Sequence, residues 1–307
     1  MKKIVTIGGG SGQSLLLQYL KQYDFEISAI VSMIDDGGST GRLRDQLDIL
    51  PPGDIRRCLI ALADDQTELQ EMMSYRFSEG ELAGHNAGNL MLAAMEKSMT
   101  DYEQSIKVFE KLLKCRGRVI PVTTELTTLQ AILEDESVIS GETNIDIPKH
   151  DAELAIKNVT LEPAVTATSS AITALQEADV IILTIGDLFT SIIPNLLVGG
   201  IAEAIADSKA QLIYTCNRQT KIGETNKFTA LEYVNRLETY LAGRKIDTII
   251  VDSTAVEAEI EPNLITYNVS ALQSHGTQVI EAELATSDGL RIDGEKLAIE
   301  LNKICNN

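Results

Sequence analysis

Short apolar runs alternate with longer amphipathic segments along most of the chain. The runs at residues 4–7, 27–33, 180–185 and 211–217 have the length of buried strands. Segments between them place leucine, isoleucine or alanine at helical spacing, as at residues 15–20. An alternation of strands and helices is typical of a parallel sheet with helices on both faces. The sequence therefore predicts an α/β fold that is Rossmann-like and doubly wound, with a mostly parallel sheet.

Residues 118–163 interrupt this alternation. The segments VIPVTT and SVISGETNI in this range are rich in β-branched residues, punctuated by glycine and aspartate, as in short strands. We therefore expect a small β-rich subdomain at about residues 118–163. The chain has no internal repeat, low-complexity tract or linker, so we expect residues 1–307 to form a single Rossmann-like domain that contains it.

A glycine-rich turn follows the first apolar run and precedes an apolar helical face that starts at Leu15. Because glycines leave the turn without Cβ atoms, backbone N–H groups can approach an anion closely, and the next helix N-terminus adds positive partial charge. A tight turn with no ligand is the alternative. We expect the turn to bind a phosphate group through Gly8, Gly9, Gly10, Ser11 and Gly12.

This turn lacks two common nucleotide fingerprints. No lysine followed by serine or threonine comes after Gly12, so the turn is not a Walker A loop. A G-x-G-x-x-G count that starts at Gly8 places Gln13 where the third small residue belongs. The turn therefore implies a nucleotide but leaves its identity open.

Polar side chains follow the predicted strands at their carboxyl ends. Asp35 and Asp36 follow residues 27–33, where doubly wound folds often bind the ribose of a nucleotide. A solvated Asp-Gly turn is the alternative, because such turns are common. Since ligands of parallel sheets bind at the carboxyl ends of the strands, we expect one shared cleft there. Its further candidates are Gly37, Gly38, Thr190, Ser191, Asn217 and, at the helix start in GHNAGN, Asn86 and Asn89.

Two arginines stand at the start of another predicted helix. This helix follows Pro51 and Pro52, with Asp54 as its N-cap and Arg56 and Arg57 in its first turn. Positive charge at a helix N-terminus opposes the helix dipole, which favours contact between one arginine and an anion. A surface position or an ion pair is an equally good interpretation, so neither arginine is assigned to the cleft.

Charge and cysteine content exclude several classes of protein. There are 26 lysines and arginines against 45 aspartates and glutamates, and the net charge of −19 opposes nonspecific binding to nucleic acid or anionic membranes. The apolar runs have strand length, well short of the roughly 20 residues of a membrane span. Four scattered cysteines without a C-x-x-C pair indicate a reduced protein. We expect a cytoplasmic protein with a small-molecule ligand.

A series of segments resembles, in order along nearly the whole chain, the gluconeogenesis factor family (YvcK-like). The family is related to 2-phospho-L-lactate transferase (CofD). The segments DDGGSTGRLR and LPPGDIRRC are the most specific, and the others are IGGGSG, LIALAD, YRF, GHNAGNL, RGRVIPVT, SIIPNLL and GETNKFT.

The resemblance implies a cytoplasmic, Rossmann-like protein that binds UDP-N-acetylglucosamine. It also implies a role in cell-wall precursor supply and cell shape when bacteria grow on gluconeogenic carbon. We expect a homodimer and, as partner, a cell-wall precursor enzyme. By position, the resemblance assigns the glycine turn, Asp35, Asp36, Asn86, Asn89, Thr190 and Ser191 to the ligand cleft. It assigns Arg291 to the diphosphate.

The chain departs from the family pattern at several positions. Asp187 stands where a small hydroxyl residue is expected, and Ile222, Asn226 and Ile292 replace a proline, an aspartate and a histidine. If the carboxylate of Asp187 faces the cleft, it will repel a phosphate unless a cation lies between them.

Three functions are consistent with the sequence. The first is a UDP-sugar-binding regulatory protein that acts through another protein with little or no turnover. The second is a CofD-like, metal-dependent transferase that uses a nucleotide diphosphate-activated donor, with GDP and magnesium as ligands and Asp36 and Asp187 as candidate metal ligands. The third, an NAD-dependent dehydrogenase, ranks last because the chain lacks the full fingerprint and an evident acid/base pair.

Overall fold

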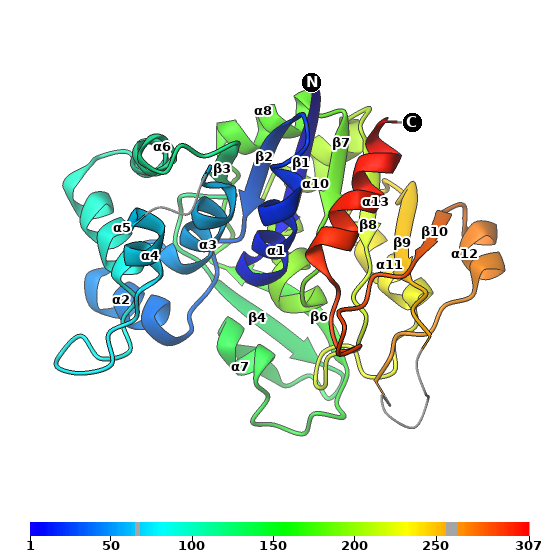
Figure 1. Cartoon of the computed structure of the whole chain (residues 1–307). Helices are drawn as coiled ribbons and strands as arrows, with labels where there is room; N and C mark the ends of the chain where they lie inside the picture. Colours follow the sequence, from blue (N-terminus) through cyan, green and yellow to red (C-terminus); the bar gives the residue numbers. More distant parts are fainter. Residues whose placement is uncertain (65–67, 256–262, 307) are drawn as a thin grey trace.

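The computed structural model describes residues 1–64, 68–255 and 263–306. Its central sheet has the strand order β10-β9-β8-β7-β1-β2-β3 in the described ranges, and every neighbouring pair is parallel (Figure 1). This confirms the predicted fold class. The strands are β1 (Lys2–Gly8), β2 (Phe25–Val31), β3 (Arg118–Pro121), β7 (Val180–Leu183), β8 (Gln211–Thr215), β9 (Thr248–Asp252) and β10 (Gln278–Ala282).

The strand order reverses at β1. The chain builds outward from β1 through β2 to β3, and then returns to place β7 on the other side of β1 before it continues outward to β10. Connections on the two sides of this point leave in opposite directions, so a crevice opens between them at the carboxyl ends of β1 and β7.

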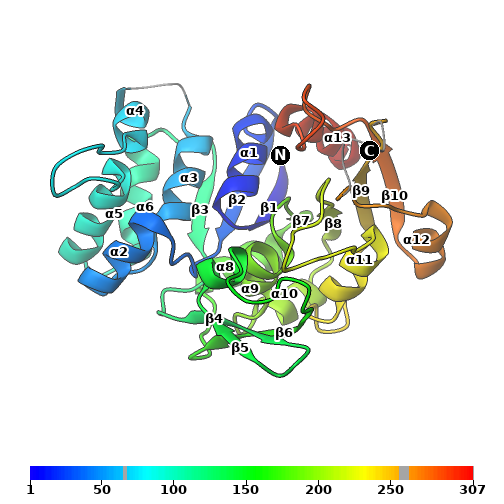
Figure 2. The ribbon, with the colours of Figure 1, turned by 90° about the horizontal axis from the view of Figure 1, so that it is seen from below.

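Helices cover both faces of the sheet. One face carries α1 (Gly10–Leu20), α3 (Pro52–Leu62) and α13 (Gly294–Asn306), and the other carries α8 (Ser169–Glu177), α10 (Ile201–Asp207) and α11 (Ala230–Glu238) (Figures 1 and 2). Because both faces are covered, the central strands are mainly apolar, and Ile4, Ile7 and Ile30 are fully buried. Each helix among the described residues is too short or too polar to span a membrane.

Four further helices gather beside the β3 edge (Figure 2). They are α2 (Gly38–Leu47), α4 (Glu68–Ser74), α5 (Ala87–Ser98) and α6 (Tyr102–Leu112). At the opposite edge, α12 (Val269–His275) lies against β10. The segment after β7 forms a π-helix, η1 (Leu188–Ile192), that continues into α9 (Ile193–Leu196).

A small antiparallel sheet lies beyond the carboxyl ends of the central strands (Figure 1). It contains β4 (Thr128–Leu133), β5 (Val138–Ser140) and β6 (Ile156–Glu162), with helix α7 (Glu142–Asp146) between β5 and β6. The predicted range of 118–163 starts too early, because β3 pairs with β2 in the central sheet. Both kinds of strand are rich in β-branched residues, so local composition could not separate them.

Candidate functional site

A cleft of about 640 Å³ lies at the carboxyl ends of β1, β2 and β7, where the strand order reverses. Open parallel sheets bind their ligands at this place. Helix α7 of the small sheet lies across from these strand ends (Figure 1), and its residues Glu142, Thr143 and Asp146 line the cleft. The predicted candidates that line the cleft are Gly9, Gly10, Ser11, Gly12, Asp35, Gly37, Gly38, Asn89, Thr190 and Ser191, and Asp187 lines it as well.

The glycine turn is packed on two sides. Gly9 is the N-cap residue of α1. A Cβ atom on Gly10 would lie 2.1 Å from Oδ1 of Asp54, and one on Gly12 would lie 1.9 Å from the carbonyl oxygen of Ile185. Any larger residue would therefore collide with α3 or with the segment after β7. The bare turn lets both of these elements reach the cleft.

Three helices begin at the cleft. The first turns of α1, α2 and α3 all line it, at Gly10, Gly38 and Gly53. The unpaired N–H groups and the dipole at a helix N-terminus favour an anion. The fold therefore directs three positive helix ends into one cavity.

Three arginines line the cleft beside these helix ends. Arg56 is buried, with 8% exposed, and its Nε has no hydrogen-bond partner among the described residues. Burial and the neighbouring Arg57 lower the pKa of Arg56 to about 10. The guanidinium of Arg57 donates to Ser11 Oγ at 3.2 Å and to Asp54 Oδ1 at 3.0 Å. With Arg76, this group is suited to phosphate oxygens.

Carboxyl groups share the same part of the cleft. Asp35 accepts a hydrogen bond from the N–H of Gly37 at 2.9 Å. Burial and the charge of Asp35 raise the pKa of Asp54 to about 6. Burial and the charge of Asp35 also raise the pKa of Glu142 to about 8. Since like charges disfavour one another's ionised forms, a proton or a bound cation stabilises this group.

Asp187 has a lysine beside it. Among the described residues, the carboxyl oxygens of Asp146, Asp187 and Glu224 lie within 4.8 Å of one another, close enough to hold a metal ion. Lys221 Nζ lies 2.8 Å from Asp146 Oδ1 and 3.6 Å from Asp187 Oδ2. The ammonium group of Lys221 thus offsets the negative charge of Asp187, which would otherwise repel a phosphate in the cleft. It also competes with a metal ion for these carboxylates.

Glu224 connects this group to η1. Its side chain is 3% exposed and accepts hydrogen bonds from the N–H of Phe189 at 3.1 Å and from Thr190 Oγ1 at 3.0 Å. Burial and the charge of Asp187 raise the pKa of Glu224 to about 8. The hydroxyl of Thr190 therefore donates its hydrogen bond to a protein group, the carboxyl of Glu224. The neighbouring Ser191 lies beside the glycine turn, 3.1 Å from a Cβ atom placed on Gly9.

Several predicted candidates lie outside the cleft lining and hold backbone in place. Asp36 accepts hydrogen bonds from the N–H groups of Glu142 at 3.0 Å and Thr143 at 2.8 Å, which ties α7 to the end of β2. Asn86 caps α5 by accepting from the N–H of Asn89. Asn217 exchanges two hydrogen bonds with the backbone of Gly186. Gly8 packs against the side chain of Thr184, the residue that follows β7. These residues shape the cleft from behind.

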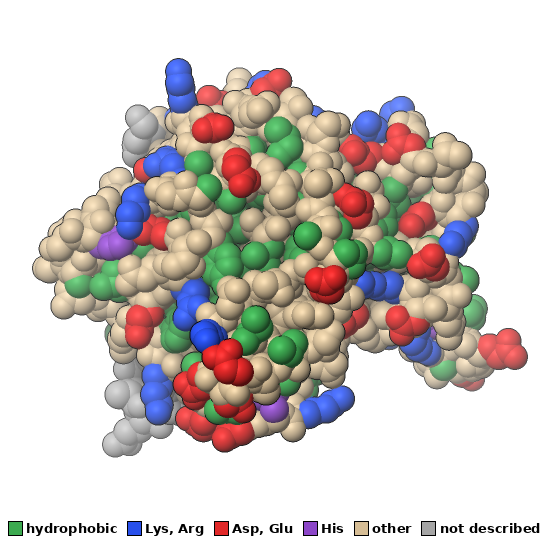
Figure 3. Space-filling view, turned by 180° about the vertical axis from the view of Figure 1, so that it is seen from behind, with side chains coloured by type: hydrophobic (Ala, Val, Ile, Leu, Met, Phe, Trp, Pro, Cys, Tyr) green, Lys and Arg blue, Asp and Glu red, His purple; other side chains and the backbone are tan. Residues whose placement is uncertain are grey.

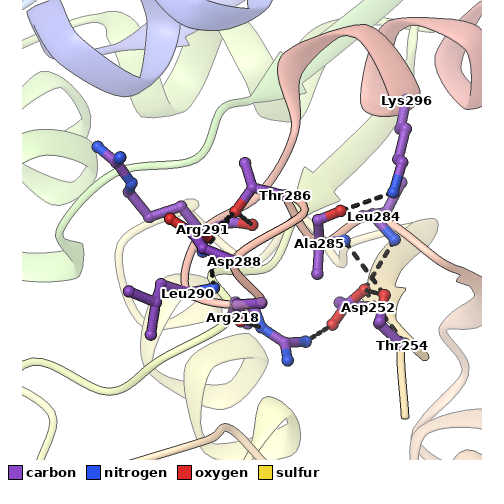
Figure 4. Close-up of polar contacts among 11 residues, drawn as sticks. Arg218, Asp252, Thr254, Leu284, Ala285, Thr286, Asp288, Leu290, Arg291 and Lys296 are labelled. Carbon is purple, nitrogen blue, oxygen red and sulfur yellow. Dashed lines mark hydrogen bonds and ion pairs between the residues drawn. The ribbon is translucent and has the colours of Figure 1, made fainter. Parts of the chain in front are cut away.

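Arg291 also lies outside the residues that line the cleft, on a turn before α13 (Figure 4). Its backbone N–H donates to Thr286 Oγ1 at 3.2 Å, which closes this turn. Its side chain points away from the buried ion pair between Arg218 and Asp252 (Figure 4). Contact between Arg291 and a diphosphate, which the resemblance implies, stays a prediction.

The cleft contains charged residues that sequence patterns do not assign to it. The sequence predicts Asp54 as a helix cap, but Pro51 is the N-cap residue of α3, and Asp54 lies in the first turn. The two arginines beside it carry a sequence signal, since they oppose the dipole of α3. Glu142 and Lys221 carry none, because only the packing of the small sheet against the loop after β8 brings them to the cleft.

Comparisons with known proteins agree with this architecture. A family model described as 2-phospho-L-lactate transferase CofD matches residues 4–285. The gluconeogenesis factor of Bacillus subtilis is 39% identical over 307 residues, which cover 96% of this chain and 96% of that protein. The gluconeogenesis factor of Halalkalibacterium halodurans is 40% identical over 262 residues, or 85% of this chain and 80% of that protein.

A solved structure has the same fold over almost the full length. The crystal structure of a UPF0052 family protein from Bacillus halodurans aligns with a TM-score of 0.91 and 34% identity, over 98% of this chain and 100% of that chain. These matches confirm the resemblance that the motifs indicated. The chain belongs to the CofD family and, within it, to the gluconeogenesis factors.

Proposed function

We propose that this protein binds UDP-N-acetylglucosamine in the cleft and acts as a regulatory protein. In this role it supports cell-wall precursor supply and cell shape during growth on gluconeogenic carbon. The name of its relatives, gluconeogenesis factor, supports this metabolic setting. We further propose that it works in the cytoplasm as a homodimer, through contact with a cell-wall precursor enzyme.

The observation that carries the proposal is the convergence of three helix N-termini on the arginines. A diphosphate in the cleft beside these helix starts would meet backbone N–H groups and the guanidinium groups of Arg56 and Arg57. The unpartnered Nε of Arg56 is a donor that such an anion can use. A volume of about 640 Å³ also falls within the range of small-molecule sites.

Two further buried atoms support a polar ligand. Ser32 Oγ and Asn89 Oδ1 line the cleft and have no hydrogen-bond partner among the described residues. An unpaired polar atom in a protein interior is costly, so such atoms commonly pair with a ligand or water. The hydroxyl and amide groups of a nucleotide sugar can donate to them.

Calorimetric titration tests the proposal. The protein is titrated with UDP-N-acetylglucosamine, GDP and NAD, each with and without magnesium. We expect selective binding of the UDP-sugar, weakened about ten- to hundredfold in Arg57→Ala by loss of a charged hydrogen bond. Arg116→Ala is the matched control, because Arg116 is exposed and pairs with Asp64 away from the cleft. Absence of UDP-sugar binding contradicts the proposal.

A second candidate function is a CofD-like, metal-dependent transferase. The observation in its favour is the group formed by Asp35, Asp54 and Glu142, in which burial and the charge of Asp35 raise the pKa values of Asp54 and Glu142. These carboxylates would hold magnesium, which would neutralise charge on the diphosphate of the donor. Binding of GDP that requires magnesium, with turnover lost in Asp35→Asn, favours the transferase over the regulatory protein.

A further inference from the structure

An apolar groove of about 660 Å³ runs between α4 and α5, outside the ligand cleft. Met72, Tyr75 and Phe77 line one wall, and Leu90 and Met91 line the other. Met72 is 47% exposed and Tyr75 is 54% exposed, which is unusual for large apolar side chains that lie next to one another. Contiguous exposed apolar surface on a soluble protein commonly marks a binding site.

The groove has the form of a receptor for a helix. Met72 lies in the last turn of α4 and Tyr75 directly follows this helix, and Ala87, Leu90 and Met91 share one face of α5. The rings of Tyr75 and Phe77 meet edge to face, with centroids 5.1 Å apart. These apolar side chains, contributed by α4, by α5 and by the segment after α4, fit the apolar stripe of an amphipathic helix, and methionines adapt to its side chains.

The charged residues along the groove indicate which kind of partner it can bind. Glu68 and Glu71 line the groove, and the described residues along it include no lysine, arginine or histidine. A second copy of this chain, with its net charge of −19, is a poor match for an acidic rim. We propose that the groove docks an amphipathic helix of a partner protein whose apolar face is flanked by lysine or arginine.

The groove shares a segment with the cleft. Residues 75–77 run extended along residues 84–87, held by the N–H of Ala87 on the carbonyl of Tyr75 at 2.8 Å and the N–H of Phe77 on the carbonyl of His85 at 2.9 Å. Successive side chains of an extended segment point to opposite sides. Tyr75 and Phe77 line the groove, and Arg76 between them lines the cleft. A helix docked in the groove would therefore shift Arg76 in the cleft. This linkage between groove and cleft rests on the proposed function of the cleft.

Selection from a displayed library of helical peptides of about 16 residues, roughly four turns each, tests the docking on the full chain. We expect enrichment of peptides with an apolar stripe and flanking lysine or arginine. Fluorescence anisotropy then measures the best peptide. We expect Tyr75→Ala with Met91→Ala to weaken it about tenfold or more, since both side chains would be central contacts. Glu68→Lys with Glu71→Lys should weaken it and reduce its salt dependence.

Matched variants keep the test specific. Leu112→Ala removes an equally exposed leucine outside the groove, and Asp24→Lys with Glu26→Lys makes the same charge change elsewhere, so neither should alter the affinity by more than about twofold. Circular dichroism checks that each variant is folded. Enrichment of acidic peptides, or binding that survives the groove variants, overturns the proposal. So does a concentration-dependent dimer that the groove variants abolish, because a second copy would then be the occupant.

The linkage has its own readout. If docking moves Arg76, the peptide changes the Kd for UDP-N-acetylglucosamine, and the sugar nucleotide changes the Kd for the peptide by the same factor. Peptide binding without any binding of the UDP-sugar leaves the docking proposal standing and refutes the proposed function of the cleft. Binding of both with independent affinities refutes the linkage alone.

Discussion

The packing around the glycine turn leaves no space for a side chain at Gly12. A Cβ atom on Gly12 would lie 1.9 Å from the carbonyl oxygen of Ile185, and backbone cannot yield as a flexible side chain can. We expect Gly12→Ala to lower the free energy of unfolding by about 1–3 kcal/mol and to abolish ligand binding. Urea unfolding and calorimetry measure both. In the control Gly199→Ala, the nearest contact is an ordinary 3.4 Å, and an equal loss there would contradict this explanation.

Lys221 offsets the charges of Asp146 and Asp187. Lys221→Met keeps much of the side-chain volume and removes that charge. The three groups are partly exposed, so we expect a loss of only about 1 kcal/mol in the free energy of unfolding at pH 8. The loss should be smaller at pH 6, where the carboxyl of Asp187, its pKa raised by burial, is more protonated. Equal losses at both pH values, or a similar loss in Lys221→Arg, would argue against the ion pair.

Among the secondary-structure elements, α7 is tied to the end of β2 by one side chain. The carboxylate of Asp36, at the end of β2, accepts from two N–H groups at the start of α7, more than a hundred residues away along the chain. We expect Asp36→Ala to cost about 1–2 kcal/mol, as loss of a helix cap does, and to speed hydrogen exchange at residues 142–147. Asp24→Ala, at the other end of β2, is the control and should leave that exchange unchanged.

At the scale of the whole molecule, buried carboxyls set the dependence of stability on pH. Burial raises the pKa of Glu224 and of Glu142 to about 8 and that of Asp54 to about 6. The folded state then holds protons more strongly than the unfolded state, whose carboxyls titrate near pH 4. As far as these groups decide it, stability is therefore greatest below about pH 4, and it falls as pH rises through this range toward 8.

We accordingly expect a Tm several degrees higher at pH 6 than at pH 8, since about 1 kcal/mol shifts the Tm of a large domain by about 2–4 °C. Differential scanning fluorimetry measures it. The glutamine in Glu224→Gln cannot titrate, so the Tm of this variant should differ less between pH 6 and pH 8. Acidic side chains also lie across the surface, and Figure 3 shows several grouped along one edge of the rear face. Repeating the scans in high salt screens these surface charges. If the Tm of Glu224→Gln still changes between pH 6 and pH 8 as much as that of the unmodified protein, the role of the buried carboxyl is contradicted.

Local sequence patterns are sufficient to predict the sheet and the place of the cleft. Apolar runs of strand length, separated by helical segments, predict a parallel sheet, and the carboxyl ends of its strands share one edge. Their places along the chain therefore suffice to assign Asp35, Thr190, Ser191 and most of the glycine turn to one cleft. These assignments succeed because backbone direction and strand ends follow from patterns within a few neighbouring residues.

Which side chains face the cleft depends on contacts between distant segments of the chain. Asp36 and Asn217 stand at strand ends as predicted, but their hydrogen bonds to α7 and to Gly186 hold them in the framework. Glu142 and Lys221 enter the cleft because the small sheet packs near the loop after β8, and Arg291 stays outside it. The physical reason is that the direction of a side chain is set by packing and hydrogen bonds between segments far apart in sequence, which local patterns do not encode.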